Sequence, residues 1–163
     1  MHSLNPSSQA PFVWIGWPGS AIEKNQQKKL SEKMRKELHY LPVFLDEKEI
    51  DGYYHGFCNR TIWPLFHCFP TLMDLEESFW ESYQKAQKKF CDALLSELRP
   101  GDVVWIHDFH LMLLPGMIRA ARPDVAVGFF LHVPFPPFEI FQLLPRQWRT
   151  RLLEGLLGAD LIG

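Results

Sequence analysis

Two short apolar runs, Val103–His107 and Val125–His132, dominate the hydrophobic pattern of the chain. Each is too short for a helix of normal length and is rich in β-branched or aromatic residues, which is typical of strands. A helical stretch and an Arg-Pro-Asp turn separate them, so the pattern predicts a β-α-β unit with parallel strands. Both runs end in histidine and a loop. Polar side chains are therefore expected at the carboxyl ends of the strands, where open α/β sheets bind ligands.

The rest of the pattern predicts further strands and a surface helix. Strands are expected at Phe12–Trp17, Leu41–Leu45 and Ala159–Gly163. Within Glu23–Tyr40, apolar residues recur every four positions among lysines, glutamates and glutamines. This spacing predicts an amphipathic helix on the protein surface, and its apolar residues are Leu30, Met34 and Leu38.

Acidic residues mark two expected helix starts. Asp46, with Glu49 three residues later, fits a capping box before a short helix. Asp74 is expected to cap a long helix that ends near Arg99. The apolar positions of that helix step by three and four, at Leu75, Phe79, Tyr83, Ala86, Phe90 and Leu94. Two more helices are expected at Phe138–Leu144 and Arg149–Leu157, with a break at Pro145.

One segment fits neither a helical nor a strand period. Residues 53–67, YYHGFCNRTIWPLFH, are dense in aromatic side chains but not cleanly periodic. No element is assigned to this segment from its pattern alone.

Composition narrows the class of protein. The 163 residues are 47% apolar, enough for one globular domain, and a net charge of −2 offers no basic patch for nucleic acid. Cys58, Cys68 and Cys91 form no CxxC pair, which argues against a disulfide framework or a zinc knuckle. No apolar run reaches the roughly 18 residues of a membrane span, and the start of the chain lacks a signal-peptide pattern. We expect a cytoplasmic protein with a disordered lead at residues 1–11.

Asp108 is the first candidate for chemistry, because it ends a strand between His107 and Phe109. An unpaired carboxylate is costly to bury, so Asp108 is expected to be hydrogen-bonded or to face a polar ligand such as a sugar hydroxyl. It suits the N-cap of a helix over Leu111–Ala121 equally well. His107 and His110 flank it, but no further ligand follows at a recognisable spacing, so no metal is expected.

Three further residues have both a functional and a purely structural interpretation. His132 ends the second strand, where a buried imidazole bonded to backbone is the simpler interpretation. Tyr54 and Trp63 each offer an apolar face for a sugar ring and one donor at the edge, although core packing accounts for such aromatics too. Arg60, between them, is expected to form a surface salt bridge.

Three stretches of the sequence together resemble one family. WIHDFHL (105–111), GFFLHVPFPPFEIF (128–141) and the aromatic segment at 53–67 are similar to trehalose-6-phosphate synthases. The members of that family are nucleotide-sugar glycosyltransferases with two Rossmann-like domains facing each other across a cleft, the GT-B fold. The resemblance extends from about Phe12 to Gly163. It implies an α/β domain with a mainly parallel sheet, most of the N-terminal, acceptor-side half, without the C-terminal nucleotide-sugar domain.

The resemblance also implies a reaction, the transfer of glucose from UDP-glucose to glucose 6-phosphate, which gives trehalose 6-phosphate without a metal or other cofactor. Asp108 matches the aspartate that contacts the acceptor sugar, and His132 matches a residue that faces the transferred glucose, so both are catalytic candidates. Tyr54 and Trp63 match residues that hold the phosphate end of glucose 6-phosphate. These 163 residues would supply mainly the acceptor half-site and would be inactive alone.

Some alternatives stay open. A non-catalytic, regulatory synthase-like domain of a trehalose-pathway protein would carry the same fold. A homo-oligomer and an associated trehalose-6-phosphate phosphatase domain or subunit are both compatible with the sequence. Neither a nucleic acid nor a membrane is expected as a partner.

Overall fold

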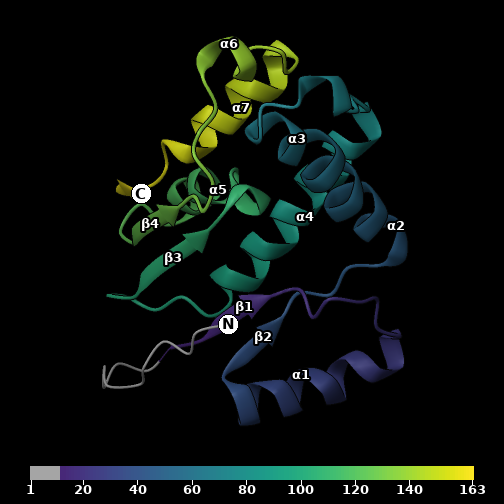
Figure 1. The fold of residues 1–163 in the computed structure, drawn as a ribbon. Coiled ribbons are helices and arrows are strands. Elements are labelled where there is room, and N and C mark those ends of the chain that lie inside the picture. Colours follow the sequence, from purple (N-terminus) through teal and green to yellow (C-terminus); the bar gives the residue numbers. More distant parts are fainter. Residues whose placement is uncertain (1–11) are drawn as a thin grey trace.

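The paired strands of the structure all run parallel to their neighbours (Figure 1). This computed structural model describes residues 12–163, so the expected disordered lead at 1–11 lies outside it. Strands β1 (Trp14–Gly16) and β2 (Tyr40–Pro42) form a two-stranded sheet. A three-stranded sheet has the order β3-β4-β5, with β3 (Val103–His107), β4 (Ala126–Phe130) and β5 (Leu161–Ile162). The predicted α/β class and the predicted strands are confirmed: β3 has the predicted bounds, β2 begins one residue earlier than predicted, and β1, β4 and β5 are shorter than predicted.

Helices flank both sheets, and their bounds are α1 (Lys24–Leu38), α2 (Glu47–Ile50), a π-helix (Asp51–Ile62), α3 (Trp63–Phe66), α4 (Glu77–Leu95), α5 (Leu114–Ala121), α6 (Phe138–Phe141) and α7 (Arg146–Leu156). In Figure 1, α1 lies on one side of β1 and β2, and the long helix α4 lies on the other. The predicted helices around Pro145 and the surface helix before β2 are confirmed. None of the helices in residues 12–163 combines the length and the apolar character needed to cross a bilayer.

The three-stranded sheet buries only one of its faces. In β3, Val104 and Ile106 are buried, whereas Val103 and Trp105 are 71% and 49% exposed. The Trp105 ring lies over Gly128 of the neighbouring strand, where an added Cβ would overlap the ring. The apolar run that predicted β3 therefore alternates between a core face and an open face.

The helix cap predicted at Asp74 is wrong. Helix α4 begins at Glu77, and the preceding Glu76 makes no side-chain cap. Asp74 instead joins the π-helix: its N–H donates to the Arg60 carbonyl at 2.8 Å, and its own carbonyl accepts from the buried Thr61 hydroxyl at 2.5 Å. Its carboxylate also pairs with Arg60 at 2.5 Å, which confirms the surface salt bridge expected of that arginine.

The aromatic segment without an assigned element is helical: the π-helix extends through it to Ile62, and α3 follows to Phe66. The Trp63 N–H donates to the carbonyl of Cys58, five residues earlier, which is the π-helical pattern. Buried residues recur along the segment every four positions, at Tyr53, Phe57, Thr61 and Leu65, and further buried residues lie between them. The apolar positions alone therefore do not mark a single helical face.

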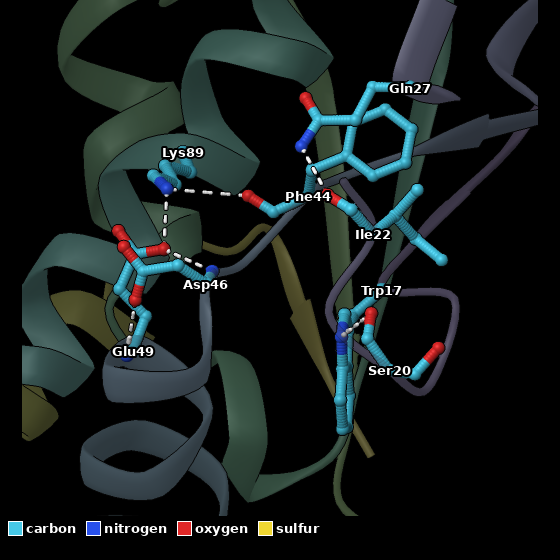
Figure 2. A network of polar contacts seen from close by, with 8 residues as sticks. All are labelled: Trp17, Ser20, Ile22, Gln27, Phe44, Asp46, Glu49 and Lys89. Atoms are coloured by element: carbon cyan, nitrogen blue, oxygen red, sulfur yellow. Dashed lines mark hydrogen bonds and ion pairs between the residues drawn. The ribbon is translucent and has the colours of Figure 1, made fainter. Parts of the chain in front are cut away.

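A polar network links the start of α2 to α4 (Figure 2). The predicted capping box is confirmed, because the Glu49 N–H donates to Asp46 and the Asp46 N–H donates to Glu49, both at 2.8 Å. Lys89 of α4 donates to the same Glu49 carboxylate at 2.6 Å and to the Phe44 carbonyl at 3.3 Å. The network fixes the start of the helix that continues into the aromatic segment.

Two adjacent lysines of α4 provide a matched test of this network. Lys89→Met is expected to destabilise the protein by about 1–2 kcal/mol, because it leaves a Glu49 carboxylate that is only 17% exposed without its cation. Lys88→Met removes an ion pair with Asp92, which is 58% exposed, and should change stability by at most about 0.5 kcal/mol. Urea unfolding of both variants measures the difference, and equal effects would contradict the role given to Lys89.

Candidate functional site

The two catalytic candidates meet at the carboxyl ends of β3 and β4. Asp108 follows β3, and its N–H donates to the Phe130 carbonyl at 2.7 Å, which continues the parallel ladder beyond the last strand pair. The His132 N–H points at a carboxylate oxygen of Asp108, 3.4 Å away. The predicted convergence of polar groups at this edge of the sheet is therefore present for Asp108 and His132.

The backbone of Asp108 is strained. Its φ of 70° and ψ of 169° lie in a region that is almost exclusive to glycine, and holding another residue there costs about 1–3 kcal/mol. The side chain makes no helix-capping hydrogen bond, and α5 begins only at Leu114. The helix-cap interpretation of Asp108 is therefore wrong. Strain of this kind persists where the surrounding structure imposes it, and it concentrates at binding and catalytic sites.

The Asp108 carboxylate is partly buried and held by donors. One oxygen lies 3.5 Å from Nδ1 of His110, and the side chain is 22% exposed. Burial raises the pKa of Asp108, but the hydrogen bond and charge of His110 and the N–H groups of Phe109 and His132 outweigh it, so the pKa lies below its ordinary value. Asp108 is thus an ionised acceptor near neutral pH.

His132 forms a pair with His107. Nδ1 of His107 and Nε2 of His132 are 3.0 Å apart, and the two rings stack with their centroids 5.2 Å apart. His132 is exposed, so the interpretation as a buried core histidine is wrong. It also lines an open, mostly apolar cavity of about 610 Å³, together with residues of β4, β5 and α7 that include Phe130, Leu156 and Ile162.

The histidine pair predicts a pH dependence of stability. Burial, and then the charge of His132, lower the pKa of His107 below the ordinary 6.5. Just below pH 6.5 the unfolded chain therefore binds more protons at His107 than the folded chain does. The free energy of unfolding is not reduced by this effect above pH 6.5, and it decreases as the pH falls toward the pKa of His107 in the folded state. As the pH is lowered from about 7.5 to about 5, the urea concentration at the midpoint of unfolding should fall less in a His107→Gln variant than in the wild type. Parallel curves would contradict this.

Tyr54 joins the site through His110. Its ring stacks on the imidazole of His110 with centroids 5.8 Å apart, and Trp17 packs on it at 5.1 Å. Neither Trp17 nor His110 is a sequence-based candidate for sugar binding. Both carry a usable signal, since Trp17 directly follows β1 and His110 follows β3 by three residues, so each lies at the carboxyl end of a parallel strand.

Trp63 stands apart from this cluster. The residue is 43% exposed, and its ring stacks on His67 with centroids 4.0 Å apart. Among residues 12–163, no hydrogen bond or ring contact joins Trp63 to Tyr54, Asp108 or His132. Tyr54 lies in the π-helix, whereas Trp63, nine residues later, is the first residue of α3.

The histidines and acids of the site do not form a metal-binding cluster. Within the part of the chain that the structure describes, no three histidine, cysteine, aspartate or glutamate side chains gather as metal ligands would. His107 turns to His132 and His110 turns to Asp108, so the sequence motif His-Asp-Phe-His is divided between two pairs.

The sequence matches one protein family along its whole length. Residues 1–163 fit the family described as Glycosyltransferase family 20. Over 151 residues the chain is 49% identical to a bifunctional trehalose-6-phosphate synthase/phosphatase of Thermoproteus tenax, a match that covers 93% of this chain and 20% of that protein. The chain spans only a fifth to a third of the length of the curated relatives it matches.

Solved structures share the fold. A UDP-forming trehalose-phosphate synthase of Burkholderia xenovorans superposes with a TM-score of 0.79 at 30% identity, over 93% of this chain and 33% of that one. The synthase of the same organism in complex with glucose-6-phosphate gives a TM-score of 0.71 at 35% identity, over 76% of this chain and 27% of that one. The N-terminal domain of Candida albicans trehalose-6-phosphate phosphatase gives a TM-score of 0.79 at 35% identity, over 91% of this chain and 31% of that one.

Proposed function

Because this chain belongs to glycosyltransferase family 20, the trehalose-6-phosphate synthase family, we propose that it binds glucose 6-phosphate as the acceptor half-site of such an enzyme. The reaction is the transfer of glucose from UDP-glucose to glucose 6-phosphate, which gives trehalose 6-phosphate. One observation carries the proposal: an ionised, partly buried Asp108 carboxylate in a strained backbone at the carboxyl edge of a parallel sheet. A relative solved with glucose-6-phosphate supports the choice of ligand.

Each candidate residue has a role in this proposal. Asp108 accepts hydrogen bonds from hydroxyls of the acceptor sugar, because an ionised carboxylate is a strong acceptor. Tyr54, backed by Trp17 and His110, offers a ring face and a hydroxyl to the sugar phosphate. Trp63, the first residue of α3, contacts the phosphate end. His132 faces the donor glucose from the rim of the apolar cavity.

We further propose that residues 12–163 form part of the acceptor-side domain and that the groups which stabilise the departing diphosphate lie elsewhere in the enzyme. Preorganised positive charge at the leaving group supplies much of the rate in such reactions. The 163 residues alone are therefore expected to form no measurable trehalose 6-phosphate from UDP-glucose and glucose 6-phosphate. Detection of the product by mass spectrometry, from protein free of other synthases, would contradict this.

A second candidate function is a non-catalytic synthase-like domain. The similarity to the N-terminal domain of Candida albicans trehalose-6-phosphate phosphatase favours it, because that name describes a domain of a protein with another activity. The two functions differ in the predicted binding of glucose 6-phosphate. An acceptor half-site binds this sugar at Asp108, whereas a regulatory domain does not require such binding.

Thermal unfolding with glucose 6-phosphate tests the proposal. A ligand that binds only the folded chain stabilises it by about 2.7 kcal/mol at a hundredfold excess over Kd, which raises Tm by several degrees. Millimolar glucose 6-phosphate should raise the Tm of the wild type and leave that of Asp108→Asn unchanged. Asp124→Asn, at an exposed carboxylate that pairs with Arg122, is the matched control and should respond like the wild type. A wild-type Tm that ignores the sugar would refute acceptor binding.

A further inference from the structure

The turn that carries Asp108 is held from inside the protein by the hydroxyl of Tyr83. This hydroxyl, from the middle of α4, donates to the Phe109 carbonyl at 2.9 Å. It also accepts from the N–H of Met112, likewise at 2.9 Å. One buried oxygen atom therefore joins Phe109 and Met112 in the segment between β3 and α5, just after the strained residue.

Two more side chains hold the same segment. Nε2 of Gln87, one turn further along α4, donates to the His110 carbonyl at 2.6 Å, and the Tyr53 hydroxyl donates to the same carbonyl at 3.2 Å. Gln87 is fully buried, and its Oε1 has no partner among the described residues. Burying an amide in a core is costly, so the presence of Gln87 is better explained by its hydrogen bond to the turn than by packing.

Tyr83 itself has little freedom to move. It is fully buried and packs against Phe57 and Trp80, with ring centroids 4.4 and 5.9 Å away. Burial raises the pKa of this phenol well above its ordinary value, so it stays neutral and can both donate and accept. The hydroxyl is thus a fixed point, and no hydrogen bond joins it to the Asp108 carboxylate in the described part of the chain.

We propose that Tyr83 is a positioning residue for acceptor binding: its hydroxyl closes the turn over residues 109–112 and so fixes the direction of the Asp108 carboxylate. A residue at the backbone conformation of Asp108 relaxes unless its surroundings over-determine it, and the Tyr83 clamp supplies that constraint. The inference rests on the proposed binding of glucose 6-phosphate for its functional meaning. Its structural content, the control of Asp108 by Tyr83, can be measured without any ligand.

The test compares Tyr83→Phe with the wild type by two readouts. The first is the NMR titration of the Asp108 carboxyl carbon, whose pKa should move from its lowered value toward the ordinary one once the carboxylate leaves His110 and the His132 N–H. The second is the affinity for glucose 6-phosphate, which should fall about tenfold with the loss of one well-placed charged hydrogen bond. Tyr40→Phe is the matched control, at a half-buried phenol on β2, and should change neither.

The outcomes separate the inference from the proposed function. An unchanged Asp108 titration in Tyr83→Phe overturns the positioning role, whether or not the affinity falls. A wild type that does not bind glucose 6-phosphate refutes the proposed function, and the Asp108 titration then decides the positioning role alone. If Tyr83→Phe does not fold, Gln87→Met takes its place. It removes the donor to His110 and the unpartnered Oε1 together, and a shifted Asp108 titration is expected again.

Discussion

Asp108→Gly is expected to be more stable than Asp108→Ala and equally unable to bind glucose 6-phosphate. Both variants lose the carboxylate and its contacts with His110 and His132. Only glycine relieves the backbone, because φ of 70° with ψ of 169° is open to glycine and costs alanine about 1–3 kcal/mol. Glycine loses about 0.4–1 kcal/mol through the greater entropy of the unfolded chain, so a net advantage of about 1 kcal/mol remains.

Urea unfolding and calorimetric titration measure this pair of effects. An advantage of about 1 kcal/mol corresponds to a Tm about 2–4 °C higher for a chain of this size. The affinity for glucose 6-phosphate should drop at least tenfold in both variants, since a charged hydrogen bond is worth about 1.5–3 kcal/mol. An Asp108→Gly variant no more stable than Asp108→Ala would contradict the strain, and tight sugar binding by either would contradict the role of the carboxylate.

Gly158→Ala is expected to be among the most destabilising single substitutions, at about 3 kcal/mol. A Cβ at Gly158 would overlap the backbone of Gly116, where α5 crosses the end of α7, and backbone cannot rotate away. Gly155 and Gly116 face each other in the same crossing. This contact holds α7 against α5, and α7 contributes Leu156 to the cavity that His132 lines.

Gly56→Ala provides the comparison for this substitution. A Cβ there would lie 2.5 Å from the ring of Phe79, a partly exposed side chain that can move where backbone cannot. The expected cost is about 1 kcal/mol, and it should shrink further when Phe79 is changed to leucine. Chemical denaturation of the variants checks the order. Equal costs at Gly158 and Gly56 would mean that the α5–α7 crossing adapts more easily than its backbone contacts imply.

The strands that carry the site can be predicted from the sequence, because their apolar runs and the polar residues at the ends of these runs are enough to identify them. The runs ending at His107 and His132 predict two parallel strands, and the rule on carboxyl ends predicts that Asp108 and His132 meet. The cap at Asp46 follows from two residues at a fixed spacing. These features depend on local chemistry, so a single sequence contains enough information to predict them.

Other features depend on distant contacts or on rare geometry. A π-helix is rare, and its hydrogen bonds join residues five apart, so the aromatic segment does not show its helix in its apolar pattern. Asp74 is a residue type that favours helix caps, but it binds Arg60 and Thr61 instead. The strain at Asp108 depends on Tyr83, a residue that its helical spacing marks only as core. Tertiary contacts decide all three.

A crystal structure of this chain with glucose 6-phosphate tests the central claim most directly. The account predicts one sugar at the carboxyl ends of β3 and β4, with a hydroxyl within about 3 Å of the Asp108 carboxylate and the phosphate on the side of Tyr54 and Trp63. The backbone of Asp108 should keep its positive φ in the complex. A sugar bound elsewhere, or no sugar at concentrations that saturate the Tm shift, would contradict the account.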